Sequence, residues 1–493
     1  MIRAALKLAT GSVIGKLSGV LREILLATAF GTGAVASAAR ASQTATLVPV
    51  EFFAANALSA GFLPLYSSIE KEGRERVIGL FWAVLSIMVP ISFGILLMLL
   101  VLAESWVSVV APGFGPEARG LTIELLKVSA LGVPFYVAGN LLSYLAMANG
   151  EFSLASMRAT IQNVGMILGI ALAWCFSDFS LIAWAFLCSY ALYSALGVRA
   201  ACVGSWAPVS MLRREYYFDS MFRFLRAIRP LLLLPVVLQA GVVAERAIAS
   251  LISDSTVAAL GYAKLITETG VLLLAMPLGL AGLATMGSMT AVEFRSVLVK
   301  VVSALLIVTV PISFILLLHG ETLVRLLFQH GEFGENSTAS TVSILSSMSV
   351  GLWAQVVSYF LVKAMSARMR NGMVVAFTMI SVAVQILISF LLYKKIGGVA
   401  LGWAAAAASV LLTFMCCWNL GVLGDFSKWL FPMLIIGGGH VAAVMTLPLP
   451  GVGELGVAGV FCGYWVLALL LWRRSRTVAF GLIRRSLGKI YDK

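Results

Sequence analysis

Residues 4–30 read AALKLATGSVIGKLSGVLREILLATAF, an apolar run long enough to cross a bilayer as one helix. Lys16, Arg22 and Glu23 lie inside this run. A cation near the middle of a membrane helix costs at least ~2.5–3.5 kcal/mol on insertion scales, so it is usually retained by a polar cavity, a partner or a substrate. The structural alternative is that Arg22 pairs with a carboxylate of another helix, or that these side chains reach the membrane interface.

The composition excludes a soluble globular chain. The 493 residues are 60% hydrophobic and only 12% charged, with a mean hydropathy of +0.99, which is typical of a polytopic membrane protein. A net charge of +13 would suggest a nucleic-acid partner for a soluble protein. Here the preference of Lys and Arg for cytoplasmic loops accounts for the charge, and no nucleic acid is expected. The six cysteines include no CxxC pair, so they predict neither a disulfide framework nor a zinc site.

Fourteen apolar segments, each near or above the ~20 residues that span a bilayer, predict an all-α polytopic membrane protein with 14 transmembrane helices. The segments are 4–30, 35–66, 77–103, 121–147, 154–176, 180–203, 228–252, 256–285, 297–318, 339–365, 373–393, 398–422, 427–447 and 452–472. With the N-terminus inside, 25 of the 35 Lys and Arg residues, Arg158 among them, count as cytoplasmic, four lie outside and six lie within spans. This asymmetry predicts a chain with both termini in the cytoplasm.

The order of segments predicts two six-helix lobes plus two C-terminal helices. Spans three and nine both carry the run Val-Pro-Ile-Ser-Phe, at 89–93 and 310–314, which indicates a repeat of six spans. A connection in which Arg alternates with Tyr and Phe separates the repeats and predicts an amphipathic helix on the membrane surface. The predicted domains are an N-terminal lobe (1–203), a cytoplasmic amphipathic linker (204–227), a C-terminal lobe (228–424), spans thirteen and fourteen (425–472) and a basic cytoplasmic tail (473–493).

Enzyme motifs are absent from the sequence. It contains no HExxH, no GxSxG and no nucleotide-binding domain, and the run at 11–17 has the wrong Gly spacing for a phosphate loop. The three histidines are scattered: we expect His319 and His330 in an outside loop, and His440 packed or hydrogen-bonded in span thirteen. No catalytic residue, cofactor or metal ion is expected.

Charged residues inside the spans indicate transport instead. The charges concentrate in spans one, two, seven and eight, the first hairpins of the two predicted lobes: Lys16, Arg22, Glu23, Arg40, Glu51, Glu245, Arg246, Lys264 and Glu268. A pseudo-twofold axis brings these hairpins together, and the positive surplus suits an anionic headgroup such as a diphosphate. Helix-breaking residues predict bends in spans two and eight, at Pro49, Gly61, Pro64, Pro277 and Gly279.

Further stretches support one family of transporters. They are Gly19–Glu23, Ala29–Gly33, Ala57–Pro64, Ala111–Phe114, Ala148–Phe152 with Asn163, Glu245–Arg246 with Ala249–Ser250, Leu260–Ala263, Pro277–Gly282 and Leu326–Phe333. Together they resemble the signature of the MurJ/MviN lipid II flippases of the MOP exporter superfamily, over spans one to twelve. The resemblance implies the same fourteen-span architecture, with spans thirteen and fourteen guiding a polyprenyl tail.

The resemblance also implies roles for individual residues. Arg22 and Glu23 resemble the family's Arg-acid pair in span one, Lys16 stands where the family has Arg, Arg246 resembles its cavity Arg and Glu268 an acidic residue of span eight. With Arg40 and Lys264, these are the predicted substrate-binding residues. The chain departs from the family at Ser37 (usually Asp), Val50-Glu51 (an Arg pair), Ala55-Asn56 (Glu-Gly) and Lys264-Leu265 (Asp-Arg).

These observations predict a flippase, not an enzyme. It would move a polyprenyl-diphosphate-linked saccharide, lipid II in the first place, across the bacterial cytoplasmic (inner) membrane by alternating access. We expect a monomer that contacts membrane lipids and uses a coupling ion or the membrane potential. The alternatives are a flippase for another lipid-linked glycan, such as an exopolysaccharide precursor, a small-molecule antiporter of the same superfamily, or a non-transport scaffold for cell-wall enzymes.

Overall fold

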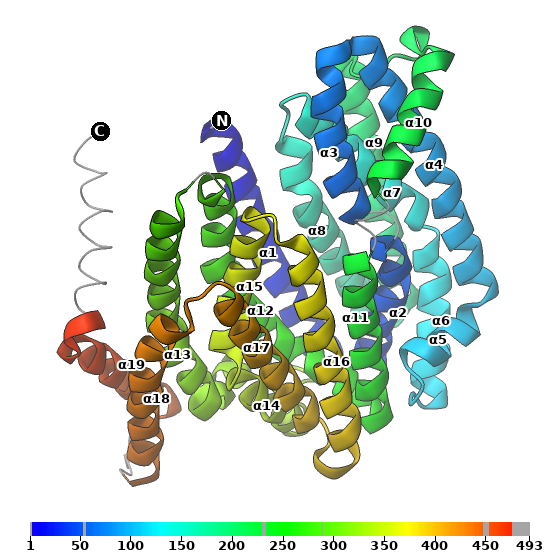
Figure 1. Cartoon of the computed structure of the whole chain (residues 1–493). Helices are drawn as coiled ribbons and strands as arrows, with labels where there is room; N and C mark the ends of the chain where they lie inside the picture. The colour runs from blue at the N-terminus through cyan, green and yellow to red at the C-terminus, as the bar shows by residue number, and fades with distance from the viewer. Residues whose placement is uncertain (1, 53–55, 229–232, 288, 447–452, 476–493) are drawn as a thin grey trace. The chain divides into compact units, whose positions relative to one another are not determined.

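The computed structural model describes residues 2–52, 56–228, 233–287, 289–446 and 453–475, and within these ranges all regular secondary structure is helical (Figure 1). Ten helices are long and apolar enough to cross a membrane. The number rises to twelve if each of two bent helix pairs forms one span. The predicted all-α polytopic architecture is therefore confirmed at this level.

The first two predicted segments lie outside this set of twelve. The helix α1 (Ile2–Phe30) carries several charges along its length, and the second segment is divided into α2 (Ala34–Val50) and α3 (Asn56–Ile69). A π-helical turn at Glu51 and Phe52 follows Pro49, which lies inside α2. Proline cannot donate a backbone hydrogen bond, and π turns often mark such irregular points. The predicted bend at Pro277 and Gly279 falls on a helical backbone whose side chains are outside the described set.

The chain forms two compact units. Unit 1 contains Met1–Ala258 and the short segment His330–Gly334, and unit 2 contains Ala259–Gln329 and Glu335–Lys493. This division differs from the predicted boundary at 204–227, and the assignment of the two lobes stays a prediction.

Unit 1 is a bundle in which α1 packs along a helix distant in sequence. After α3 its elements are η2 (Glu70–Glu72), α4 (Arg74–Val101), α5 (Ala103–Val110), α6 (Pro116–Ala130), α7 (Val133–Ala148), α8 (Ser153–Phe176), α9 (Ser180–Gly204), η3 (Val209–Met211), α10 (Arg214–Ile228) and α11 (Leu233–Ile252). α1 lies against α8, α2 against α6, and α9 against both α7 and α8. α6 and α7 form the first bent pair, at 47°.

Glycines spaced four residues apart allow the close approach of α1 and α8. A Cβ atom at Gly11 would lie 2.4 Å from the Cβ of Ser156, and one at Gly15 would lie 2.8 Å from the Cβ of Ala159. Real Cβ atoms do not approach so closely, and only small residues allow helix backbones to pack in this way. The run at 11–17 therefore contributes a helix-packing surface.

The residues of the predicted linker include the helix α10, and a position on the membrane surface stays a prediction. Phe224 and Ile228 of α10 are buried, with Phe224 against Gly61 of α3, whereas Phe218 and Phe222 are exposed. The polar side of α10 is held by ion pairs, since Arg223 contacts Glu72 and Asp219 at 3.0 Å each. α10 thus packs on α3 and α4 of the same unit.

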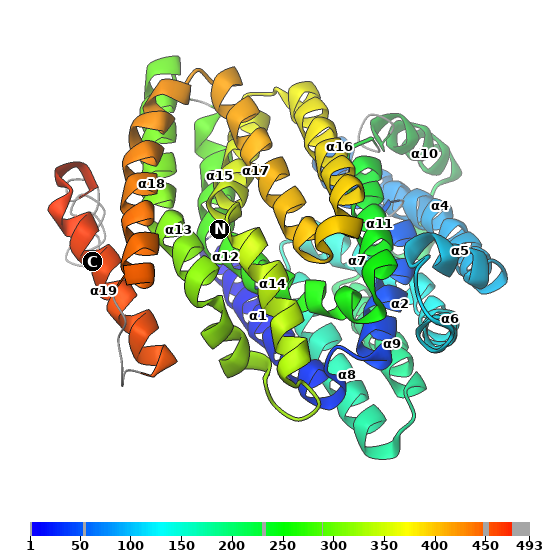
Figure 2. The same ribbon diagram turned by 90° about the horizontal axis from the view of Figure 1, so that it is seen from below.

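Unit 2 repeats the order of elements found in unit 1. Its helices are α12 (Asp254–Met286, which begins in unit 1), α13 (Ala291–Phe328), α14 (Glu335–Ser349), α15 (Leu352–Ala367), α16 (Asn371–Ile396), α17 (Val399–Asn419), α18 (Leu423–Thr446) and α19 (Glu454–Leu471). Like α4, α13 is a long helix with a proline inside, and a bent pair, α14 and α15 at 53°, follows it. Two long helices follow the bent pair in each unit, α8 and α9 in unit 1 and α16 and α17 in unit 2. α18 and α19 lie beside α13, as Figure 2 also shows.

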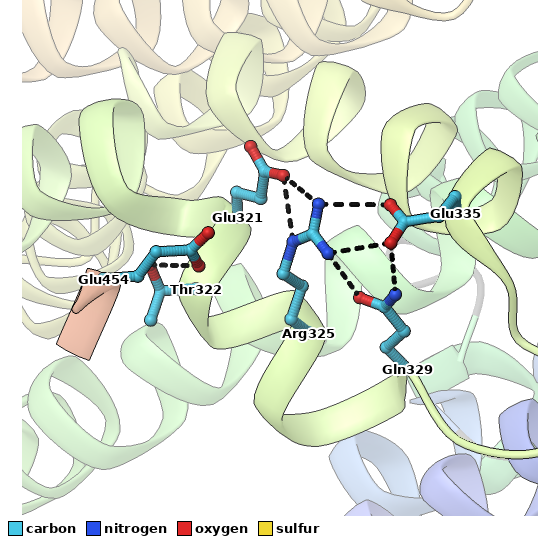
Figure 3. A network of polar contacts seen from close by, with 6 residues as sticks. All are labelled: Glu321, Thr322, Arg325, Gln329, Glu335 and Glu454. Atoms are coloured by element: carbon cyan, nitrogen blue, oxygen red, sulfur yellow. Dashed lines mark hydrogen bonds and ion pairs between the residues drawn. The ribbon is translucent and has the colours of Figure 1, made fainter.

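A polar network fixes the end of α13 (Figure 3). The guanidinium of Arg325 donates to Glu321 at 2.7 Å and to Glu335, the first residue of α14, at 2.9 Å. Gln329 donates to Glu335 at 2.8 Å. These bonds hold the two ends of the turn at 330–334.

That turn is part of unit 1. The backbone N–H of Glu332 donates to the carbonyl of Thr28, near the end of α1, at 2.9 Å. Gly331 has a φ of +58°, and a Cβ there would lie 2.3 Å from the Thr28 carbonyl oxygen. Only glycine combines this left-handed conformation with so close an approach. The turn at 330–334 therefore packs against the end of α1 within unit 1.

Candidate functional site

Two arginines share one buried carboxylate in unit 1. The side chain of Arg22 donates to Glu23 at 2.5 Å, and Arg40 of α2 donates to the other carboxylate oxygen of Glu23. Glu23 is 5% exposed and Arg40 8%. Hydrogen bonds between ionised groups are the strong ones, and a buried carboxylate needs such partners. The carboxylate that Arg22 contacts thus belongs to its own helix, not to another helix as the structural alternative supposed.

Asn163 of α8 orients Arg22 from the other side. It accepts a hydrogen bond from Arg22 at 3.0 Å and donates to the carbonyl of Gly15 at 2.8 Å. The close packing of α1 against α8 at the glycines brings the side-chain amide of Asn163 within hydrogen-bond distance of Arg22. Asn163 belongs to the resembling motifs but not to the predicted site, although an Asn inside an apolar span is itself a signal of a buried polar partner.

Arg246 of α11 joins the same cluster. It donates to the carbonyl of Val257 at 2.8 Å, and it interacts electrostatically with Glu23. Arg22 and Arg40 thus contact Glu23 directly, and Arg246 acts on the same carboxylate at longer range. We call these four residues the arginine cluster.

The three remaining predicted site residues are Lys16, Lys264 and Glu268. Lys16 is half-buried on α1. Lys264 and Glu268 belong to unit 2, where they form an ion pair of 3.8 Å along α12. Their role in binding a substrate stays a prediction.

Unit 1 contains a second set of polar contacts that was not predicted from the sequence. The hydroxyl of Tyr136 in α7 donates to Glu51 at 2.5 Å and accepts a hydrogen bond from Arg158 of α8 at 3.3 Å. Tyr190 of α9 packs on Tyr136, with ring centroids 4.7 Å apart. The charge count placed Arg158 among the cytoplasmic residues because it lies near a span end, whereas its guanidinium reaches inward to Tyr136.

Ser37, one of the departures from the family pattern, has a packing role. It is fully buried, and its hydroxyl donates to the carbonyl of Asp254 at 2.7 Å. The carboxylate of Asp254 accepts from the backbone of Gly115 at 3.1 Å. The hydrogen bond of Ser37 therefore links α2 to the turn between α11 and α12.

The prediction that His319 lies in an outside loop is wrong. α13 continues to Phe328, and His319 lies within it at a kink with φ −124° and ψ 16°. Its Nε2 is 3.3 Å from Nε2 of His440 on α18, and Trp465 of α19 donates to Nδ1 of His440 at 3.1 Å. The predicted hydrogen-bonded His440 is confirmed. Among the described residues, no group of three or more His, Cys, Asp or Glu side chains could hold a metal ion.

The helix order, the bent pairs and the buried charges define a polytopic transporter of the MOP superfamily fold. A solved lipid II flippase MurJ in an inward closed conformation superimposes with a TM-score of 0.82 at 18% identity, over 95% of this chain and 99% of that chain. An inward-facing MATE transporter of the MOP superfamily gives 0.69 at 14% identity, over 86% and 98%. These likenesses establish the fold.

Sequence comparison then identifies the family. The model of the lipid II flippase MurJ family matches residues 26–475, and the chain belongs to this family of transporters, which are not enzymes. Two relatives carry the name "Probable lipid II flippase MurJ". The protein of Rhizobium tropici is 28% identical, over 80% of this chain and 77% of its own. The protein of Rhizobium meliloti (strain 1021) is 25% identical, over 97% and 94%.

Proposed function

We propose that this chain moves lipid II, a polyprenyl-diphosphate-linked saccharide, from the inner to the outer leaflet of the cytoplasmic membrane. The arginine cluster is the observation that carries the proposal. Within this cluster, two guanidinium groups on one carboxylate and Arg246 at longer range leave a positive surplus, and the planar guanidinium suits bidentate contacts with phosphate oxygens. The saccharide would occupy the polar interior while the polyprenyl tail stays in lipid.

The proposal includes fourteen spans with both termini in the cytoplasm. It adds α1 and the pair α2–α3 to the twelve apolar spans, because charge and a break are tolerated where they face protein rather than lipid. Lys16, Lys264 and Glu268 would complete the substrate-binding set. The chain would act as a monomer by alternating access, driven by an ion gradient or by the membrane potential, which acts at about 2.3 kcal/mol per charge per 100 mV.

Replacement of a cell's own lipid II flippase tests this function. The wild-type chain should restore growth to depleted cells and prevent lipid II from accumulating in the inner leaflet. Arg22→Ala and Arg246→Ala should abolish replacement at normal membrane levels, whereas the Lys variants should restore part of it because bidentate contacts are lost. Arg295→Ala is the matched control, since Arg295 is exposed and pairs with Asp425. Full activity of both Ala variants would contradict the assignment.

A flippase for another lipid-linked glycan is the second candidate, and Glu51 favours it. The resemblance places an Arg where this chain has Glu51, and that carboxylate is engaged by Tyr136. A changed charge beside the substrate suits a different headgroup. In that case the chain would fail to replace a lipid II flippase, and deleting it from its own cell would cause a different polyprenyl-linked precursor to accumulate.

A further inference from the structure

Arg158 lies inside an apolar helix, and among the described residues no carboxylate is at ion-pair distance from it. It is the sixth residue of α8, a helix apolar enough to cross a membrane, and its side chain is half-buried. In the described part of the chain, its one hydrogen bond goes to the hydroxyl oxygen of Tyr136, at 3.3 Å. Arg22 and Arg40 differ, since both contact Glu23.

The hydrogen bonds of Tyr136 leave most of the guanidinium unused. Tyr136 gives its only proton to Glu51, so its oxygen faces Arg158 as an acceptor. A guanidinium has five N–H donors, and this contact uses one. The remaining donors suit an anion with several oxygens, such as a phosphate group.

Glu51 is connected to Arg158 through Tyr136. It does not reach ion-pair distance from Arg158 in the described structure, because Tyr136 stands between them. The carboxylate therefore holds the tyrosine in place while lowering the positive potential around Arg158. A guanidinium that is only partly neutralised is a better anion site than one in a closed ion pair.

Arg158 and Arg22 belong to the same polar interior. Tyr190, which packs on Tyr136, interacts electrostatically with both arginines. On α8, Arg22 contacts Asn163, five residues after Arg158. A ligand held at the arginine cluster thus has a further cation available in the same unit.

The geometry points to Arg158 as a second anion-binding residue for the diphosphate of the transported lipid, positioned by Tyr136 and weakened by Glu51. The inference rests on the proposed function and adds a specificity-determining residue outside the arginine cluster. It also gives Glu51 a definite effect: this carboxylate limits affinity and so favours release of the anion.

Binding of a short-chain prenyl diphosphate to the purified full-length chain tests the inference, with the prenyl alcohol of the same length as the uncharged control. Arg158→Ala should weaken diphosphate binding about tenfold or more, because hydrogen bonds to charged groups are the stronger ones. Arg158→Lys should recover part of the affinity. Arg295→Ala should bind like the wild type, and none of the variants should change binding of the alcohol.

Glu51→Gln separates an anion site from a structural role. The amide oxygen still accepts the proton of Tyr136, while the negative charge is removed. We expect diphosphate binding to strengthen several-fold with an unchanged unfolding temperature. If Glu51 and Arg158 only stabilise the fold, Glu51→Gln will lower the unfolding temperature without strengthening binding, and the inference is wrong.

These binding measurements also separate this inference from the proposed function. If Arg22→Ala abolishes binding and Arg158→Ala leaves it unchanged, the inference fails and the proposed function stands. If the wild type binds diphosphate and alcohol equally, the proposed function fails as well. Should Arg158→Ala not fold, the Lys variant and Glu51→Gln still decide the question.

Discussion

Glu23 forms ion pairs with two arginines, so replacing Glu23 should affect stability differently from replacing either arginine. With Arg22→Ala, Arg40 keeps its contact with Glu23. With Glu23→Gln, both guanidinium groups lose their counter-charge in a buried place. Breaking a buried ion pair by removing one partner is more costly than the net contribution of the pair, because a buried charge is left uncompensated.

We therefore expect Glu23→Gln to lower stability by about 3–5 kcal/mol. Arg22→Ala should have a smaller effect on stability, although it abolishes transport. Thermal unfolding of the detergent-solubilised variants measures the difference. A larger loss for Arg22→Ala than for Glu23→Gln would show that Glu23 is not the centre of the cluster.

The packing of α1 on α8 makes a prediction about whole helices. Gly15→Ala places a Cβ 2.8 Å from that of Ala159, so the two helices must separate. Overpacking of this kind costs about 1–3 kcal/mol, against a gain in helix propensity of less than about 1 kcal/mol. The unfolding temperature should fall and Arg22 should lose its contact with Asn163.

Gly94→Ala in α4 is the matched control, because a Cβ there meets no atom within 4 Å. It should leave the unfolding temperature unchanged or raise it slightly. Equal effects of the two substitutions would mean that α1 and α8 do not pack through their glycines.

His440 joins three helices of unit 2. It accepts the indole N–H of Trp465 and contacts His319, so α13, α18 and α19 meet at one imidazole. His440→Phe keeps an aromatic ring but leaves the Trp465 N–H, which is buried, without its acceptor. We expect a loss of about 1–3 kcal/mol in unfolding experiments. Trp418→Phe, at a 71% exposed position, should show no such loss.

Topology is the prediction that concerns the complete chain. Reporters fused at Lys71, Arg214 and Lys493 should be cytoplasmic, and reporters at Gly113 and Asn336 should be outside, because Lys and Arg accumulate on the cytoplasmic side. Labelling of single cysteines at these positions is an independent measurement. Reporters at Arg214 and Gly113 found on the same side would contradict the assignment of the spans.

Hydropathy predicted the helices because it follows from local sequence, and the family resemblance implied the pair of Arg22 and Glu23. Hydropathy and charge did not predict that Arg158 is directed into the protein. A cation near the end of a span is assigned to a loop unless its contacts are known. The same limit applies to His319, whose helix continues past the apolar run because Arg325 pairs with Glu321 and Glu335. Depth and partners of a polar residue depend on tertiary packing.

The turn at 330–334 has a consequence for biosynthesis. Unit 1 includes this turn, so the hydrogen bond from the Glu332 N–H to the Thr28 carbonyl forms only after 332 residues have been translated. At 5–20 residues per second, the ribosome needs roughly 4 to 15 s to pass from the end of α11 to this turn. During that interval the Thr28 carbonyl of α1 lacks its hydrogen bond from Glu332. The nascent N-terminal helices must therefore persist as a partly assembled bundle, and a truncation before residue 330 would leave that bundle permanently incomplete.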